Sequence, residues 1–331
     1  MPLTRQAPLW QQRLSQAVTD PRELLRLLAL DPDLLPAAVL AARDFRLRVP
    51  RGYVARMRPG DPDDPLLRQV LPLAAELERL PGFVTDPVGD LAAMPGPPGL
   101  LHKYHGRVLL IATGACAIHC RYCFRRHFPY EDAQAASDDW QAALAHIAAD
   151  PSIREVILSG GDPLALSDRR LSTLVGALDA IPHVERLRLH TRLPIVLPER
   201  IDDALLVWLS ASRLHKIVVA HANHAQEIDD AVRVALRALA DTGATLFNQS
   251  VLLRGVNDDV DTLAHLSETL FAAGVLPYYL HRLDPVQGAG HFDVPDDEAR
   301  SLMQALVARL PGYLMPRLVR EIPGQAAKTA L

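Results

Sequence analysis

The amino-acid sequence predicts an α/β fold, in which an open partial (β/α)6 barrel follows an N-terminal helical layer. Leucines repeat at helical spacing in the first hundred residues, where prolines separate the segments. Beyond that point, short runs rich in Val, Ile and Leu are each followed by a longer segment of helical period. We therefore predict a helical region over residues 1–100 and a barrel domain over residues 101–331.

The helical region contains two leucine-rich segments, residues 21–30 and 66–80, which we expect to form helices. Proline-rich stretches at residues 59–62 and 95–98 interrupt and end this region. We expect most of it to dock against the barrel without a share in catalysis.

Six apolar runs predict the strands of the barrel, at intervals mostly of about 25 to 40 residues, as βα units require. They cover residues 107–113, 155–159, 184–190, 216–220, 245–252 and 276–281. Because parallel βα units twist in one direction, six of them build an open barrel rather than a closed one of eight. Polar residues gather where these strands end, which is where such sheets carry their active sites.

The chain of 331 residues has a formal charge of −4 and a sequence pI near 6.3, so it has no basic field for binding nucleic acid. Neither its start nor a later stretch has the apolar run of a signal peptide or a membrane span. Three cysteines within eight positions, with none elsewhere, argue against disulfides. We therefore expect a cytoplasmic protein without nucleic-acid or membrane partners, whose cysteines bind metal.

Cys116, Cys120 and Cys123 follow the first predicted strand in a C-x3-C-x2-C pattern. Thiolates bind iron, and a 4Fe-4S cluster held by three cysteines keeps one iron open. That iron can chelate S-adenosylmethionine through its amino and carboxylate groups and pass an electron to its sulfonium. The alternative is a zinc site in a non-catalytic interaction module. Structural zinc is nearly always closed by a fourth protein ligand, for which His119 and His127 are the candidates.

Gly160, Gly161 and Asp162 end the second predicted strand in a Gly-Gly-Asp-Pro turn. Glycines let a backbone approach a ligand closely and expose its N–H and C=O groups. Such a turn suits the methionine amino group of S-adenosylmethionine on the open iron. We therefore expect these three residues to bind the cofactor.

With these motifs in hand, the sequence resembles the lysine 2,3-aminomutase family of radical S-adenosylmethionine enzymes. The resemblance extends from about residue 104 to residue 328 and depends on an ordered series of segments. They read CAIHCRYCFRR from Cys116, LSGGDPL from Leu158, TRLPIVLPERI from Thr191, HANH from His221, NQSVLLRGVND from Asn248 and PYYLH from Pro277. The resemblance implies the fold of the radical S-adenosylmethionine (radical SAM) enzymes, a partial (β/α)6 TIM barrel.

The family implies a third cofactor, pyridoxal 5'-phosphate, held covalently by a lysine near the C-terminal end of the catalytic domain. Lys328 occupies that place in the segment GQAAK. By position alone, a lysine so close to the end of the chain would be a solvated charge. The chemistry implied is migration of the amino group from C2 to C3 of an α-amino acid, with S-adenosylmethionine as a recyclable coenzyme.

Further site residues follow from the same resemblance. Arg125 resembles the arginine that binds the substrate carboxylate, a task suited to a guanidinium. The positions that correspond to cofactor contacts are Lys103, Tyr104 and Arg107 for pyridoxal phosphate, and Tyr122, His221 and Gln249 for S-adenosylmethionine. For Lys103 a solvated charge is the alternative, and for His221 a buried structural imidazole.

Asp284 and Glu321 lie where the lysine enzymes of the family bind the distal ammonium of their substrate. Each charged hydrogen bond to such a cation contributes about 1.5 to 3 kcal/mol. The resemblance therefore implies L-lysine as substrate and (R)-β-lysine as product, with glutamate or arginine as the alternative substrates. Without the family, Asp284 could form a turn and Glu321 could be a surface charge.

Two departures from the family pattern are visible. The segment before Lys328 has fewer glycines than in many relatives, so the approach of the phosphate is expected to differ there. The chain also ends at Leu331, without the C-terminal extension or additional cysteines of the stand-alone enzymes. In this it resembles the short bacterial branch that makes (R)-β-lysine for elongation factor P. The implied partners are the ligase that modifies elongation factor P and an electron donor such as flavodoxin or ferredoxin.

Overall fold

The computed structural model describes residues 7–94, 96–130 and 140–331. Within them, nine strands form one sheet in sequence order. They are β1 (Leu100–Tyr104), β2 (Arg107–Thr113), β3 (Glu155–Gly160), β4 (Arg186–Thr191), β5 (His215–Ala220), β6 (Thr245–Val251), β7 (Leu276–His281), β8 (Arg317–Arg320) and β9 (Thr329–Ala330). Neighbours from β2 to β8 are parallel, whereas β1 and β9 pair antiparallel at the two edges.

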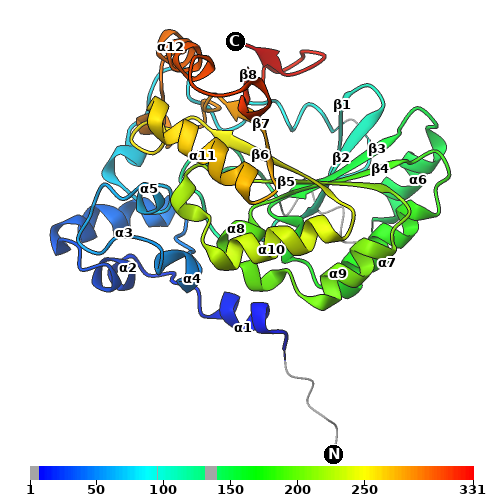
Figure 1. The fold of residues 1–331 in the computed structure, drawn as a ribbon, viewed down its shortest axis with the longest axis horizontal. Helices are drawn as coiled ribbons and strands as arrows, with labels where there is room; N and C mark the ends of the chain where they lie inside the picture. Colours follow the sequence, from blue (N-terminus) through cyan, green and yellow to red (C-terminus); the bar gives the residue numbers. More distant parts are fainter. Residues whose placement is uncertain (1–6, 95, 131–139) are drawn as a thin grey trace, which may run out of the picture.

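The predicted open α/β barrel is therefore confirmed. All six predicted strands are present with ends that differ from the prediction by at most two residues. The short strands β1, β8 and β9 were not predicted, and they extend the sheet at both edges. Figure 1 shows the curved sheet with helices packed on its outer side.

Helices connect the parallel strands, as βα units require. They are α6 (Gln141–Ala149), α7 (Asp168–Asp179), α8 (Leu193–Val196), α9 (Asp203–Ala211), α10 (Asp230–Asp241), α11 (Val260–Ala272) and α12 (Asp296–Val307). The carboxylates of Asp202, Asp229 and Asp259 each accept a backbone N–H at the start of a helix, which fixes where α9, α10 and α11 begin. Among the described helices, none is long and apolar enough to cross a membrane.

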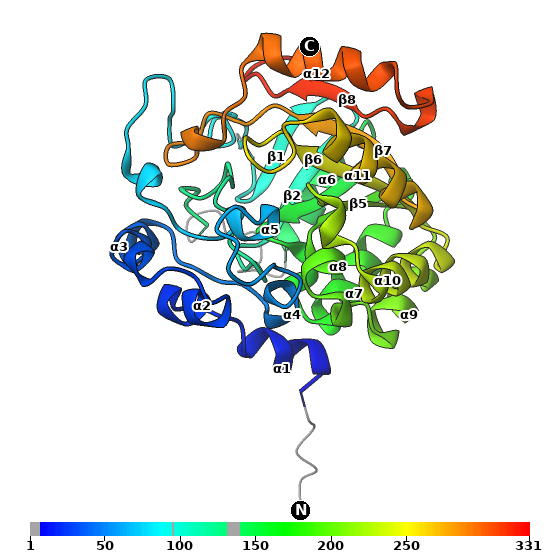
Figure 2. The same ribbon diagram turned by 60° about the vertical axis from the view of Figure 1, so that its left-hand side comes forward.

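The N-terminal region consists of short helices. They are α1 (Leu9–Ser15), α2 (Pro21–Leu27), α3 (Leu35–Asp44), α4 (Arg51–Val54) and α5 (Pro65–Arg68), and Figure 2 shows α1 to α4 along one flank of the molecule. The predicted helix at residues 21–30 is confirmed by α2. The prediction for residues 66–80 is wrong, because only α5 and a 3-10 turn at Ala74–Leu77 form there. Pro72 lies between them and cannot donate a helical hydrogen bond.

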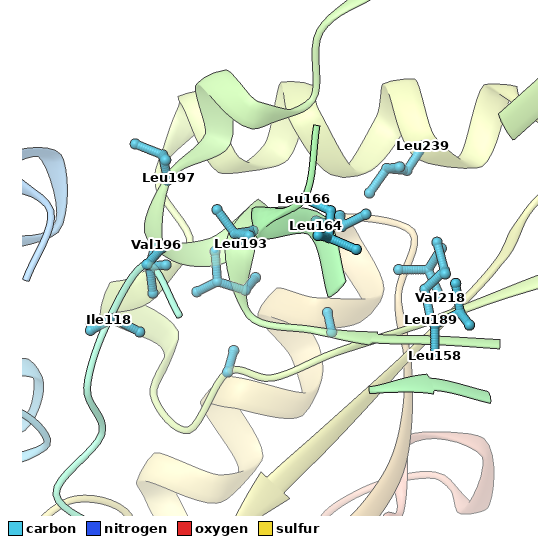
Figure 3. Close-up of a cluster of buried hydrophobic side chains, with 14 of the residues drawn as sticks. Ile118, Leu158, Leu164, Leu166, Leu189, Leu193, Val196, Leu197, Val218 and Leu239 are labelled. Carbon is cyan, nitrogen blue, oxygen red and sulfur yellow. The ribbon is translucent and has the colours of Figure 1, made fainter. Parts of the chain in front are cut away.

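The barrel and the N-terminal region share one buried apolar cluster. Trp10 and Tyr53 belong to it together with Leu158 and Leu189 from the central strands. Figure 3 shows part of this cluster between the sheet and α10, and Ile118 from the loop after β2 is among its members. The division at residue 100 thus remains a prediction from composition. Residues 1–6 and Pro95 lie outside the described residues. Residues 1–6 belong to the start of the sequence, which lacks a signal-peptide run.

Candidate functional site

A cavity of about 670 Å³ opens at the carboxyl ends of the parallel strands. Every site residue predicted from the sequence lines it. They are Lys103, Tyr104, Arg107, Cys116, Cys120, Tyr122, Cys123, Arg125, Gly160, Gly161, Asp162, His221, Gln249, Asp284, Glu321 and Lys328. The sheet topology thus brings residues from most of the barrel's length to one place.

The three cysteines lie on the loop that follows β2, and the N-terminal region holds this loop in place. The backbone N–H of His119 donates to the carbonyl of Arg48 at 2.9 Å, and that of Arg121 donates to the carbonyl of Gln69 at 2.9 Å. Ile118 anchors the loop in the buried cluster. The positions of the cysteine sulfurs therefore depend on packing against residues far away in the sequence.

The electrostatics of the loop favour a cationic metal centre. Burial and the neighbouring cysteines raise the pKa of the Cys123 thiol to about 11 and that of Cys116 above its ordinary value. Thiolates at these positions thus need a cation, which iron supplies. His119 and His127, the candidates for closing a zinc site, each direct one ring nitrogen to a backbone carbonyl, of Arg46 and Gln287. The donor set fits a cluster with three cysteine ligands.

Gly160, the last residue of β3, and Gly161 pack closely against the end of β2 and the cysteine loop, and their expected contact with the cofactor remains a prediction. The N–H of Gly161 donates to the carbonyl of Thr113 at 2.7 Å, and that of Asp162 donates to the carbonyl of Ala115 at 2.8 Å. A Cβ atom on Gly161 would lie 2.4 Å from the carbonyl oxygen of Ala115, and one on Gly160 would lie 2.5 Å from that of Thr113. The prediction of free N–H groups facing the cofactor is therefore wrong for Gly161 and Asp162.

The side chain of Asp162 is also engaged within the protein. Its carboxylate accepts the hydroxyl of Thr191 at 2.7 Å and the backbone N–H of Arg192 at 2.7 Å. Burial raises the pKa of Asp162, although these hydrogen bonds act in the opposite direction. Asp162 thus ties the end of β3 to the end of β4 and reaches the cavity as part of its wall.

Arg125, the predicted carboxylate-binding residue, is held by a residue that the sequence did not indicate. Its Nε donates to Asp90 at 2.7 Å and its Nη1 to the hydroxyl of Ser159 at 3.2 Å. The other oxygen of Asp90 pairs with Lys103 Nζ at 2.7 Å. Burial alone would raise the pKa of Asp90, but the two cations outweigh it and lower that pKa. Asp90 therefore orients two predicted site residues at once.

Lys328 lies at the edge of the cavity, where side chains join the two edges of the sheet. Its Nζ is 2.8 Å from one carboxylate oxygen of Glu321, and the hydroxyl of Tyr104 donates to the other oxygen at 2.5 Å. Tyr104 belongs to β1, whereas Glu321 directly follows β8. This contact bridges the open side of the barrel. Lys328 is thus neither a free tail nor fully buried, since a quarter of its side chain is exposed.

Asp284 is the second predicted acid near Lys328. Burial raises its pKa to about 7, an effect to which Glu321 adds and which Lys328 reduces. Its buried Oδ1 has no hydrogen-bond partner among the described residues. The pKa of Glu321 is instead lowered, because Lys328 and Tyr104 outweigh its burial. The two acids therefore differ in charge near neutral pH, and Asp284 has capacity for a donor.

Three imidazoles line the cavity, and of these only His221 was predicted as a site residue. Nε2 of His190, His221 and His281 is buried without a partner among the described residues, as is Oε1 of Gln249. Burial, with Arg192 and Lys328 nearby, lowers the pKa of His221 to about 4. These histidines are neutral at physiological pH and have unpaired ring nitrogens for a polar ligand.

Two further features concern the predicted cofactor contacts. The guanidinium of Arg107 lies 4.7 Å from the ring centre of Tyr104, and Arg317 lines the same cavity. The hydroxyl of Tyr122 accepts Asn223 Nδ2 at 2.7 Å, which fixes its ring beside the cysteine loop. The roles assigned to these residues remain predictions.

The N-terminal region takes part in the site more than its composition suggested. Phe45, Val88 and Asp90 line the cavity. The expectation that this region serves mainly for docking is therefore corrected for these residues. Their sequence surroundings have no motif, and only the tertiary fold brings them to the cavity.

We predict that Gly161→Ala displaces the cysteine loop, because its Cβ would overlap the carbonyl of Ala115. The variant should retain less iron after anaerobic reconstitution than the unmodified protein. Gly176→Ala is the control, since a Cβ at Gly176 meets nothing within 4 Å. Equal iron content in Gly161→Ala, measured per folded chain, would contradict this prediction.

This chain is similar to known proteins, both around the cysteine loop and over nearly its whole length. A family model described as a 4Fe-4S single cluster domain matches residues 105–183, which include the cysteine loop. L-lysine 2,3-aminomutase from Escherichia coli (strain K12) is 54% identical over 323 residues, covering 97% of this chain and 94% of the relative.

Other relatives carry the same name. L-lysine 2,3-aminomutase from Haemophilus influenzae is 46% identical over 328 residues, covering 99% of this chain and 97% of the relative. That from Clostridium subterminale is 34% identical and covers 97% of this chain and 77% of the relative. Since the identity extends over nearly the whole of its length, this chain belongs to the lysine 2,3-aminomutase family.

Proposed function

We propose that this chain is a radical S-adenosylmethionine, pyridoxal phosphate-dependent L-lysine 2,3-aminomutase that forms (R)-β-lysine. One observation carries the proposal: a single cavity is lined by three cysteines, the amine of Lys328 and the acids Asp284 and Glu321. The relatives named L-lysine 2,3-aminomutase support it.

The cysteine end of the cavity would hold the 4Fe-4S cluster and S-adenosylmethionine. Three cysteines bind three irons, so the fourth iron is open to a ligand. The cluster would supply the electron that cleaves S-adenosylmethionine into methionine and a 5'-deoxyadenosyl radical. Tyr122, His221 and Gln249 line the same cavity, and the unpartnered polar atoms of His221 and Gln249 suit the hydroxyl and amine groups of S-adenosylmethionine.

The part of the cavity around Lys328 fits pyridoxal phosphate. The chain has three lysines, and Lys103 and Lys328 are the two that line the cavity. Lys103 is held between Asp90 and the carbonyl of Val88, which favours Lys328 as the attachment site. Arg107 and Arg317 offer guanidinium groups for a phosphate. The cofactor would supply an imine whose double bond allows nitrogen to migrate between adjacent carbons.

The protein's own residues would select and orient the amino acid. Arg125, held by Asp90 and Ser159, presents a guanidinium to the carboxylate. Asp284 and Glu321 suit a distal cation, whereas a second carboxylate such as that of glutamate would be repelled. Arginine carries a cation as well and is the second candidate substrate, because the same acid pair fits a guanidinium.

Lysine turnover tests the proposed function. Anaerobically reconstituted protein with reductant, S-adenosylmethionine and pyridoxal phosphate should convert L-lysine to (R)-β-lysine, identified by chiral analysis. Arginine and glutamate are offered in parallel. Unchanged lysine with a fully loaded cluster would refute the substrate assignment.

The acid pair gives a sharper test of selectivity. We expect Asp284→Asn to weaken lysine binding by at least about tenfold, since one charge-assisted hydrogen bond contributes about 1.5 to 3 kcal/mol. Asp284→Asn/Glu321→Gln should abolish turnover. The control is Asp261→Asn on α11, whose side chain is 79% exposed. Lysine turnover that survives the double substitution would place the ammonium site elsewhere.

The pH dependence of lysine binding follows from the raised pKa of Asp284. Its carboxyl is ionised above about pH 7 and neutral below it, so its attraction for ammonium is lost as the pH falls. The apparent affinity for lysine should therefore decline on the acid side of neutrality. Asp284→Asn should remove this decline, and a variant with the original pH profile would contradict the assignment.

Lys328→Ala should prevent the visible absorbance of the pyridoxal imine from forming, because the attaching amine is gone. Cleavage of S-adenosylmethionine under reducing conditions should remain measurable, since the cysteines are untouched. Lys216→Ala is the control, because Lys216 lies on β5 and donates to the carbonyl of Ser212. Retained imine absorbance in Lys328→Ala would place the cofactor on another lysine.

The proposal extends to the cellular role. The resemblance to the short bacterial branch supports a product destined for elongation factor P through a separate ligase. A cluster with an open iron and three thiolate ligands would be compatible with a reducing compartment, which supports the cytoplasm. Flavodoxin or ferredoxin would be the electron donor.

A further inference from the structure

We infer that Arg192 sets the reduction potential of the iron–sulfur cluster through a hydrogen bond to Cys120, and that the N-terminal region holds it in position. Arg192 is a positioning residue, because it contacts a cluster ligand rather than the substrate. The inference depends on the cluster part of the proposed function and not on the identity of the amino acid.

The guanidinium of Arg192 reaches the cysteine loop from the end of β4. Its Nη1 lies 2.7 Å from Cys120 Sγ. The backbone N–H of Arg192 donates to Asp162 Oδ2 at 2.7 Å, which fixes where the side chain begins. A cationic donor is thus aimed at one of the three sulfurs that would bind iron.

The other terminal nitrogen of Arg192 is held by three acceptors. Nη2 donates to Gln69 Oε1 at 2.6 Å, to Glu227 Oε2 at 2.9 Å and to the hydroxyl of Tyr53 at 3.2 Å. The guanidinium carbon lies 5.6 Å from the ring centres of both Tyr53 and Tyr122. The group therefore has a fixed plane and cannot turn away from Cys120 without losing these contacts.

A second set of contacts holds the acceptors. Glu227 Oε1 accepts the backbone N–H groups of Asn223 at 2.8 Å and His224 at 3.0 Å. Gln69 Oε1 also accepts Asn223 Nδ2 at 2.9 Å. The side chains of Arg192 and Glu227 are only 6% and 0% exposed, so water screens their charges little.

These contacts couple the cluster to the N-terminal region. Tyr53 belongs to α4 and Gln69 directly follows α5, whereas Cys120 and Glu227 belong to the barrel. Reduction adds a negative charge to the cluster and its sulfurs. A cationic N–H donor at Cys120 stabilises that charge and raises the potential, whereas the carboxylate of Glu227 opposes it.

Two substitutions should shift the potential in opposite directions. In Glu227→Gln, Arg192 keeps its place while the opposing negative charge is lost, so the midpoint potential should rise. In Arg192→Gln/Glu227→Gln, the buried pair is removed without a net change of charge, and the donor to Cys120 is lost. The midpoint potential should then fall. A fall of about 59 mV corresponds to a tenfold change in the ratio of reduced to oxidised cluster at a fixed applied potential.

The measurement is an anaerobic redox titration of the reconstituted protein without S-adenosylmethionine, monitored by the electron paramagnetic resonance signal of the reduced cluster. Arg188→Gln/Glu155→Gln is the matched control. It removes another ion pair of the barrel, in which Arg188 and Glu155 lie 2.6 Å apart. It changes no contact of a cysteine. Its potential should equal that of the unmodified protein.

Equal potentials in the unmodified protein and the Arg192→Gln/Glu227→Gln variant, both with full iron content, would overturn the inference. If the double variant fails to hold iron, the potential of the Glu227→Gln variant is the deciding measurement. A midpoint potential equal to or lower than that of the unmodified protein would then overturn the inference. Loss of iron from both variants would also overturn it, because the network would then maintain the fold rather than the potential.

The outcomes separate this inference from the proposed function. Shifted potentials in a protein that leaves lysine unchanged would refute the lysine assignment alone. Normal lysine turnover with unshifted potentials would refute the role of Arg192 alone.

Discussion

The close approach of two backbones organises the whole site. At the end of β3, the N–H of Gly161 donates to the carbonyl of Thr113 at the end of β2 at 2.7 Å, and that of Asp162 donates to the carbonyl of Ala115 in the cysteine loop at 2.8 Å. Only glycine fits so close to these carbonyls. Asp162 then binds the start of the segment after β4, from which Arg192 reaches back to Cys120. This turn thus helps to place both the cysteine loop and the cation that faces Cys120.

The N-terminal region completes this arrangement. It supplies Asp90 for Arg125 and Lys103, and it supplies Tyr53 and Gln69 for Arg192. Apart from the contact between Asp90 and Lys103, these contacts join residues 35 to 139 positions apart, so they exist only once the helical layer has packed on the barrel. The helical layer and the barrel therefore act as one unit around the site, although their compositions differ.

Local patterns explain what the sequence predicted correctly. The six strands of the barrel are runs of β-branched and leucine residues, and the cysteine spacing indicates iron by itself. Lys328 was identified only through resemblance, because a lysine near a terminus has no local signature. The helix expected over residues 66–80 failed at Pro72, and β9, with two residues, is too short for a periodic signal. Asp90 has no motif, since its role arises from two partners that the fold brings to it.

The contact between Tyr104 and Glu321 closes the seam between the first and last strands, and the same carboxylate is bound by Lys328. An amine that forms an imine with a cofactor gives up N–H donors, which weakens its contact with a neighbouring carboxylate. Under the proposed function, Glu321 would then become available to the ammonium of the incoming amino acid. Attachment of the cofactor and selection of a cationic side chain would thus involve the same carboxylate.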